Sequence, residues 1–447
     1  MSTPTTGSST EAAPRPPSGD RPEKRTERGL SGQSGSRHAG QAALLRQVAS
    51  SPAVVGLLAV LTALILSSIL ILAADSEVRY TATYLLNRPG DFLHATASTL
   101  SEAYSSLLRG AVFDWRATTG VRMIRPITDT LTNATPLIIA GLGMAVAFRA
   151  GLFNVGGQGQ IILGAMAGGY VGFAWSLPAG AHIAAAMAAA AAGGALWAGI
   201  AGVLKATTGA SEVITTIMLN SIAAHLLSQV LSLKAFNGEG ETGNRKSLTV
   251  ADTAQYPSLA GDSFRLHAGF LLALLVAVAV WWLMERSRLG FQLRATGLNA
   301  DAARTAGMSV PWVTSLVMMI SGALCGLAAT APVLGTQKSM DESVVGTIGF
   351  DAITVALLGR SRPLGTVLAG LLFGALRAGG TAMQAAPGTH IKIVLVLQST
   401  IVLFIAAPPL VRAIFRLPER RALTGGADPS PASVPAAAPA APAAKEA

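Results

Sequence analysis

The chain has 447 residues, of which 51% are hydrophobic and only 13% are charged. Soluble domains carry about 25% charged residues, so the composition excludes an ordinary soluble protein and indicates several membrane spans. The formal net charge of +10 is explained by cytoplasmic arginine and lysine, and we expect no nucleic-acid partner. The single cysteine, Cys325, excludes an intrachain disulfide and a cysteine-based metal site.

The two ends of the chain differ in composition from its middle. Residues 1–45 are rich in Ser, Gly, Pro and Arg, and we predict a disordered cytoplasmic tail because they cannot bury enough apolar surface to fold. Residues 416–447 are rich in Pro and Ala and are also predicted to be disordered. Residues 46–415 are predicted to form one transmembrane domain.

The middle of the chain contains about ten apolar stretches, most of them near the roughly 20 residues that a transmembrane helix needs. We therefore predict an all-α polytopic membrane protein, with some helices broken or re-entrant. An even number of spans places both basic tails in the cytoplasm and the segments 75–128 and 233–264 outside. The short stretch 345–359 is either a span or a re-entrant segment. The predicted spans are residues 51–73, 131–149, 153–175, 182–204, 211–232, 266–285, 311–335, 345–359, 363–384 and 391–411.

The segment Arg149–Gln160 reads RAGLFNVGGQGQ and interrupts an apolar region. Its glycines permit an unwound backbone, and its side-chain amides can satisfy the freed backbone groups. Two interpretations stay open: a broken helix beside a translocation path, or a cytoplasmic turn between two spans. In the first, Asn154, Gln158 and Gln160 are candidate path residues. The phosphate-binding pattern Gly-x-x-x-x-Gly-Lys-Ser/Thr is absent from the whole sequence, so the chain does not hydrolyse ATP by that route.

The segment Ser211–Asn220 reads SEVITTIMLN. Glu212 opens a predicted span, where the N-terminal end of a helix favours a carboxylate, and it is also a candidate path residue. Asn220 lies deeper, and polar groups inside a membrane face the bundle interior or a cavity. A hydrogen bond between helices and a contact with a ligand both fit Asn220.

A polar, basic island over residues 286–310 separates two apolar stretches. It contains the signals of a short helix: Asn299 can cap it, Asp301 suits its positive end, and Gly307 can close it in a left-handed conformation. Such a helix, held at the membrane surface by flanking spans, indicates a docking surface for another protein. The small residues expected to leave its surface bare are Ala302, Ala303 and Ala306.

The segment Gly346–Pro363 reads GTIGFDAITVALLGRSRP, and Asp351 is its only acidic residue. This carboxylate can line a pathway, cap a half-helix or pair with a basic residue, and all three roles stay open. The six histidines show no metal-ligand spacing, and no serine lies in a nucleophile-elbow pattern. We therefore expect neither a catalytic site nor a metal site.

Four motifs follow one another along the chain: GLFNVGGQGQIILGA, SEVITTIMLN, LRATGLNADAARTAGM and GFDAITVALLGRSRPLGTVLAGLLFGALRAGG. Together they resemble the permease subunits of bacterial ABC importers for simple sugars and nucleosides, within the ribose/branched-chain amino acid permease group. The resemblance covers about residues 130–410. The chain departs from the family at Gln158, where many relatives have glutamate, and this leaves a charge-dependent role there in doubt.

The resemblance implies a multi-pass permease of the bacterial cell membrane, not an enzyme, that forms the pathway for a nucleoside or simple sugar, with nucleosides favoured. It implies ATPase subunits that use the ATP, a second permease subunit and an extracellular substrate-binding lipoprotein, while this chain binds no cofactor. The alternative is an ion- or proton-coupled secondary transporter of a small polar solute, which requires intramembrane groups such as Asp351, Glu212 and His225. The residues that match the family's ATPase-coupling helix are Asn299, Ala302, Ala303, Arg304 and Gly307.

Overall fold

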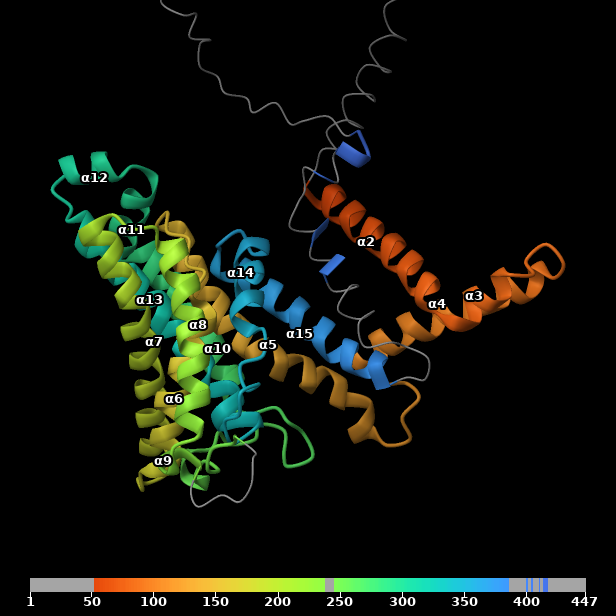
Figure 1. Ribbon diagram of the computed structural model, residues 1–447, viewed down its shortest axis with the longest axis horizontal. Helices are drawn as coiled ribbons and strands as arrows, with labels where there is room; N and C mark the ends of the chain where they lie inside the picture. The colour runs from red at the N-terminus through yellow and green to blue at the C-terminus, as the bar shows by residue number, and fades with distance from the viewer. Residues whose placement is uncertain are drawn as a thin grey trace, which may run out of the picture. The chain divides into compact units, whose positions relative to one another are not determined.

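The computed structural model describes residues 52–237 and 245–385, and the short pieces 399–400, 403–404, 410 and 413–416. The predicted tail 1–45, nearly all of the tail 416–447 and most of the predicted span 391–411 lie outside these residues. The compact unit Val55–Arg416 holds the elements discussed below, apart from the first three residues of α2 (Figure 1). They are α2 (Pro52–Ala74), α3 (Ser76–Ala82), α4 (Pro89–Ala111), α5 (Gly120–Arg149), α6 (Gly157–Ala174), α7 (Ala181–Thr208), α8 (Glu212–Leu231), α9 (Lys234–Asn237), η1 (Asp252–Ala254), α10 (Gly269–Arg286), α11 (Arg288–Leu298), α12 (Ala300–Thr305), α13 (Val310–Ala328), η2 (Ala331–Thr336), α14 (Ile348–Leu358) and α15 (Pro363–Ala385).

The prediction of an all-α polytopic membrane protein is confirmed. Six of the described helices are long and apolar enough to cross a membrane: α5, α7, α8, α10, α15, and α13 continued through η2. A seventh candidate joins Leu61–Ala74 of α2 to α3 across a bend of 78°. The apolar helix α14 has only 11 residues, about 16 Å at 1.5 Å per residue. It is too short to span, which favours the re-entrant interpretation of residues 345–359.

Two elements differ from the prediction. Helix α5 begins at Gly120, eleven residues before the predicted span, because charged residues near its start hide its continuity with the apolar part. The segment 75–128, for which no helix was predicted, contains the 23-residue helix α4. Its buried Ala95, Ala103, Leu107 and Ala111 recur at helical spacing, and it packs against α15 and α5.

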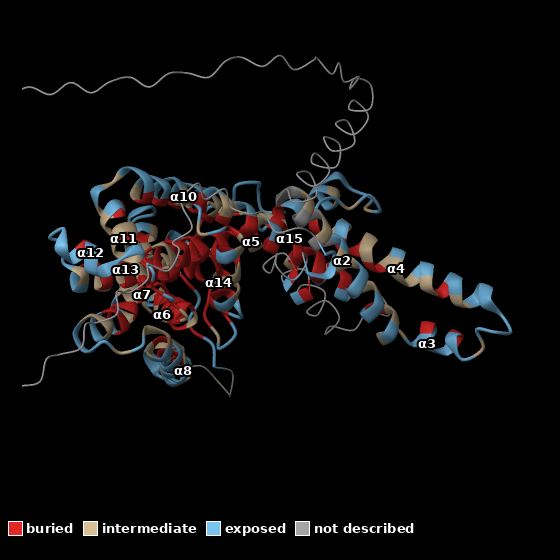
Figure 2. Ribbon diagram, turned by 90° about the horizontal axis from the view of Figure 1, so that it is seen from above, coloured by how far each residue is buried: buried red, intermediate tan, exposed pale blue. Residues whose placement is uncertain are grey.

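Helix α5 lies at the centre of the bundle. The apolar window of this helix is 83% buried, and α10, α13, α14 and α15 all pack against it (Figure 2). Its residues Leu137, Ile138, Ile139 and Leu142 are fully buried. A helix that is apolar all round is expected in such a central position.

Small residues set the closest helix contacts. Helices α7 and α13 touch at Gly194 and Gly322, where a Cβ on either residue would overlap the backbone of the other. Lipid offers helices no hydrophobic drive to associate, so such close backbone approach supplies the packing energy. The Gly-rich runs of the predicted spans are therefore packing surfaces.

Candidate functional site

The connection between α5 and α6, residues 150–156, is irregular backbone held by buried amides. Asn154 is fully buried, and its Nδ2 donates to Gln160 Oε1 at 3.0 Å and to Ser321 Oγ at 2.9 Å. Its Oδ1 accepts from the Gly156 N–H and from Gln160 Nε2, both at 2.9 Å. Asn154 and Gln160 therefore stabilise the break and connect it to α13, and their amide groups point at protein partners.

Asn220 on α8 supports the same break. Its Nδ2 donates to the Val155 carbonyl at 2.9 Å, and its Oδ1 accepts from the Gly159 N–H at 2.8 Å. Freed backbone groups inside a membrane protein need such partners. Of the two roles left open for Asn220, the structure shows the hydrogen bond within the protein.

Glu212 stands in the first turn of α8 and forms an ion pair with Lys205 at 3.0 Å. Its carboxylate is mostly shielded from solvent. The helix N-terminal position and the paired cation both stabilise the negative charge. The structure thus places Glu212 at the α7–α8 turn and beside the irregular connection, because its carboxylate also has a backbone hydrogen bond with Phe153.

Gln158 joins the start of α6 to the start of α14. Its Nε2 donates to the Gly346 carbonyl at 2.7 Å, and its Oε1 accepts from the Gly349 N–H at 3.1 Å. An amide can donate and accept at once, whereas an ionised glutamate only accepts. A glutamine fits this position, because the contact needs a donor as well as an acceptor.

Asp351, in the first turn of α14, pairs with a cation that the sequence did not suggest. Its Oδ2 accepts from Arg377 at 2.7 Å and from the Thr347 hydroxyl at 3.0 Å. Of its three possible roles, pairing with a basic residue is the one observed. Arg377 comes from α15, so the pair ties the short helix to a full span.

A polar pocket of about 210 Å³ lies beside this pair, between α5, η2, the segment 343–348 and α15. The sequence did not predict this pocket, because Asp129 precedes the predicted span 131–149. Asp129 and Asn133, four residues apart, share one face of α5, and that spacing was the available signal. The charged and amide residues that line this pocket are Asp129, Asn133, Arg265, Gln337 and Arg377.

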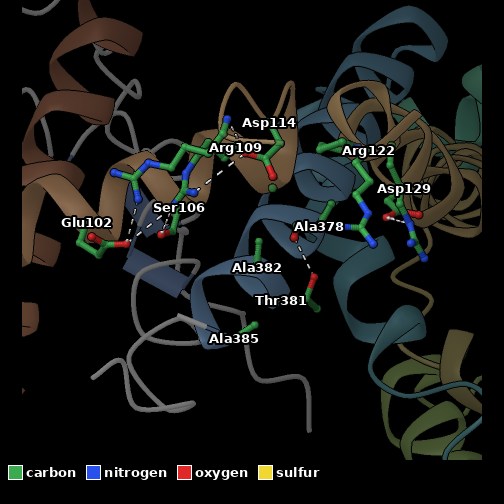
Figure 3. A pocket seen from close by; sticks show the side chains of 14 residues that line it. Glu102, Ser106, Arg109, Asp114, Arg122, Asp129, Ala378, Thr381, Ala382 and Ala385 are labelled. Atoms are coloured by element: carbon green, nitrogen blue, oxygen red, sulfur yellow. Dashed lines mark hydrogen bonds and ion pairs between the residues drawn. The ribbon is translucent and has the colours of Figure 1, made fainter. Parts of the chain in front are cut away.

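A second, wider groove of about 710 Å³ lies between α4, α5 and α15 (Figure 3). Its charges are largely paired: Arg109 lies 3.6 Å from Glu102 and 4.0 Å from Asp114. Asp129 lines this groove as well as the polar pocket. The two cavities therefore meet at one carboxylate.

The predicted docking island contains two helices, α11 and α12. Asn299 caps α12 by accepting from the N–H groups of Asp301 and Ala302, both at 3.0 Å, and Gly307 follows with φ +82°. Leu298, at the corner between the two helices, is 88% exposed. One detail was wrong: Ala303 is only 3% exposed, because it faces inward, whereas Ala302, Arg304 and Ala306 lie on the surface.

Helix α11 rests directly on the end of α5. A Cβ on Gly297 would lie 2.6 Å from the Ala150 carbonyl carbon and 2.8 Å from the Gly151 nitrogen, so backbone meets backbone. Glu285, at the end of α10, binds Arg149 at 2.6 Å and Arg294 at 3.1 Å. The ends of α5 and α10 and the whole of α11 are thus joined three residues from the buried Asn154.

A comparison with known protein families identifies the family of this chain. The family described as "Branched-chain amino acid transport system / permease component" matches residues 127–406. The chain belongs to this permease family. The resemblance inferred from the four motifs is confirmed, and the family favours a permease over an ion-coupled transporter.

Several curated permeases are similar to this chain. The guanosine ABC transporter permease protein NupP of Bacillus subtilis (strain 168) is 38% identical over 289 residues, covering 64% of this chain and 83% of the relative. The glucose ABC transporter permease protein TsgB13 of Haloferax volcanii is 38% identical over 289 residues, covering 62% and 75%. The nucleoside ABC transporter permease protein NupB of Lactococcus lactis is 32% identical over 306 residues, covering 67% and 83%. This chain is accordingly a multi-pass membrane permease.

Proposed function

We propose that this chain forms the solute pathway of an importer that takes up nucleosides and is driven by separate ATPase subunits. Two of the similar permeases described above are named for guanosine or nucleosides and one for glucose. A ribonucleoside and a hexose share a hydroxylated ring, and the polar pocket offers the hydrogen-bonding groups that such a ring needs. The phosphate-binding loop missing from the sequence is supplied by the ATPase partner, where ATP is bound and used.

The observation that carries the proposal is the exposed α12 helix with its own cap and stop. A capped helix of small residues beside an exposed leucine suits insertion into a groove of a protein partner. Asn299, Ala302, Arg304 and Gly307 shape this docking surface, and Ala303 packs beneath it. The basic residues around it suit the cytoplasmic side of the membrane, which is where ATP is available.

The contacts of α11 supply a route by which docking reaches the pathway. When the ATPase subunits close on ATP, α11 and α12 move with them. The backbone contact between Gly297 and Gly151 transmits the shift to the connection between α5 and α6. The ion pair of Glu285 with Arg149 makes the ends of α5 and α10 move together. From this connection, the hydrogen bond of Asn154 to Ser321 transmits the shift to α13. The hydrogen bonds of Gln158 to Gly346 and Gly349 transmit it to α14. Packed elements with two arrangements convert such small shifts into switching.

The complete importer contains further partners. A second permease subunit completes the pathway, and an extracellular substrate-binding lipoprotein delivers the solute on the side opposite α12. Both termini of this chain lie in the cytoplasm of a bacterial cell, on the side of α12. The segments 75–128 and 233–264 then face outward.

Reconstitution tests the proposal. The chain is assembled in proteoliposomes with candidate ATPase and second-permease subunits, and ATP hydrolysis and uptake of radiolabelled adenosine, guanosine, uridine and glucose are measured. Ala302→Trp, on the exposed face of α12, should abolish solute-stimulated hydrolysis and uptake together. The matched control is Ala181→Trp, at an exposed alanine in the first turn of α7, which should leave both unchanged. Uptake without any ATPase, or uptake driven by an ion gradient, would refute the importer.

A further inference from the structure

The polar pocket between α5, η2 and α15 lies at a depth suited to a solute on its way inward. Asn133 precedes Arg149, the last residue of α5, by sixteen positions. At 1.5 Å per residue this is about 24 Å along the helix. Because the Arg149 end carries the docking helices, the pocket belongs to the opposite half of the membrane. It is therefore accessible to a solute that arrives from the side away from α12.

Asp129 is the exceptional group in this pocket. Its Oδ2 lies 3.7 Å from Arg125 Nε, which is an ion pair without a short hydrogen bond. Its Oδ1 is shielded from solvent and has no hydrogen-bond partner among the residues that the structure describes. An unmet acceptor on a carboxylate is unfavourable, and a ligand that donates to it removes that cost. The Asp129 side chain as a whole is 27% exposed, so a solute can reach this side chain, and rotation of the carboxylate presents Oδ1 to it.

The other charged groups of the pocket are largely paired. Arg377 is neutralised by Asp351 at 2.7 Å and Asp129 lies 3.7 Å from Arg125, so Arg265 adds one further positive charge to the lining. Asn133 donates to the Asp129 carbonyl at 2.9 Å, which fixes its amide on the same helix face. Hydrogen-bond donors and acceptors thus surround a space with a small positive surplus from Arg265. Cations are disfavoured there, whereas a ring with several hydroxyl groups finds both donors and acceptors.

We infer that this pocket binds the hydroxylated ring of the transported solute, with the Asp129 carboxylate accepting hydrogen bonds from two adjacent hydroxyl groups. The inference rests on the proposed function, because it names the place where the imported solute is held. Arg265 and Gln337 supply donors on the opposite side of the ring. The base of a nucleoside, or the rest of a hexose, extends toward the wider groove at which the pocket meets α4.

The test compares each probe with its deoxy analogue in the reconstituted transporter. In the wild type, one of two preferences should appear as a lower KM: adenosine over 2′,3′-dideoxyadenosine for a ribose ring, or glucose over 2-deoxyglucose for a hexose ring. Asp129→Asn should raise the KM for the hydroxylated member by about tenfold or more, as expected for hydrogen bonds to a charged group. The KM of the deoxy analogue should change less than about twofold. Whichever pair responds identifies the ring as ribose or hexose.

Two matched variants separate recognition from structure. Arg125→Gln removes the ion pair of Asp129 but leaves its carboxylate, and it should keep the preference for the hydroxylated member. Asp114→Asn makes the same substitution at a carboxylate that lines only the wider groove, and it should also keep that preference. The inference is overturned if the wild type shows ATP-dependent uptake while Asp129→Asn leaves the preference unchanged, or if Arg125→Gln abolishes it equally. Absence of any ATP-dependent uptake by the wild type would instead refute the proposed function.

Discussion

The two ends of α5 are built for different tasks. At the Arg149 end, Glu285 joins two arginines, Gly297 meets Gly151 backbone to backbone, and the Asn154 amide is fully hydrogen-bonded. At the Asp129 end there are two cavities, and one carboxylate oxygen lacks a partner among the described residues. The comparison teaches that one helix can be tightly packed and hydrogen-bonded at one end and incompletely satisfied at the other, as the proposed transmission of motion and the proposed binding of a solute respectively require.

The strongest way to break this comparison is to separate α11 from α5. Gly297→Val places a branched side chain against the Ala150 and Gly151 backbone, so α11 must shift. We expect solute-stimulated ATP hydrolysis and uptake to fall by more than about tenfold, because misplacement of the transmitting contact uncouples the two ends. Gly90→Val, at a position with open space, is the control. Normal coupled uptake by Gly297→Val would remove this contact from the route.

The amide cluster is the next largest test. Asn154→Leu leaves Gln160, Ser321 and the Gly156 N–H without partners inside the bundle. We expect a loss of about 3 kcal/mol in the free energy of unfolding, measured by chemical denaturation in detergent. Asn87→Leu, at an exposed asparagine, should change it by less than about 0.5 kcal/mol. Equal effects of the two substitutions would show that the cluster does not stabilise the break.

The pocket end should depend on pH through His267, next to Arg265. Burial, reinforced by the Arg265 charge, lowers the pKa of His267 from 6.5 to about 4. The ring stacks on Tyr256 at 5.4 Å, and its Nδ1 accepts from the Gly269 N–H at 3.1 Å. Because the folded-state pKa lies below the unfolded value, the stabilisation is fully present above pH 6.5 and is lost as pH falls through 4.

At pH 5 this linkage amounts to about 2 kcal/mol relative to pH 7.5. The measurement is the thermal midpoint of the wild type and His267→Phe across pH 7.5 to 4.5. Phenylalanine keeps the stacking but cannot titrate, so the variant should lose most of the pH dependence. His225→Phe, at an exposed histidine of α8, should keep it. A wild-type midpoint that does not change with pH would contradict a buried neutral His267.

The smallest effect is expected at Gln158, between the two ends. Gln158→Glu removes the donor to the Gly346 carbonyl while keeping the acceptor for Gly349. We expect a loss of about 1 kcal/mol in the free energy of unfolding at pH 7.5. Protonation restores the donor, so the loss should shrink at pH 5. Gln158→Met, which has neither group, should show no such recovery. Equal stability of wild type and Gln158→Glu would mean that the bridge to α14 is unimportant.

Local signals predicted the docking end well. Asn299 caps the helix and Gly307 ends it through contacts with residues only a few positions away in the sequence. Their roles could therefore be predicted without knowing the fold. The glycines and amides of residues 149–160 likewise predicted irregular backbone satisfied by side-chain amides, with a broken helix and a cytoplasmic turn both left open. In both cases the partner of each group is a near neighbour in sequence, except Ser321 and Asn220.

The Asp129 end of α5 was harder to predict from the sequence. Arg377 is 26 residues from Asp351, and Arg265 lies on a different segment from Asp129, so their meeting depends on how the spans pack. Asp129 looked like the end of an external segment because its charge precedes the apolar part of α5. Helix α4 was not predicted because most of its buried residues are small alanines that are widely spaced. Their role as a packing surface becomes evident only when α4 lies against α15. The inward orientation of Ala303 is also a tertiary result.

The sequence by itself determined the membrane class, the capped helix α12, the irregular backbone after α5 and the permease family, because composition, capping and motif order are local properties. The tertiary structure alone decided that Asn154, Gln160 and Asn220 support the backbone, that Gln158 must donate as well as accept, and that Asp351 binds Arg377. It also decided that one carboxylate, Asp129, lines a polar pocket with an oxygen that has no hydrogen-bond partner among the described residues. The physical reason is that a hydrogen-bond partner or a cavity belongs to the packing of distant segments, which no local pattern records.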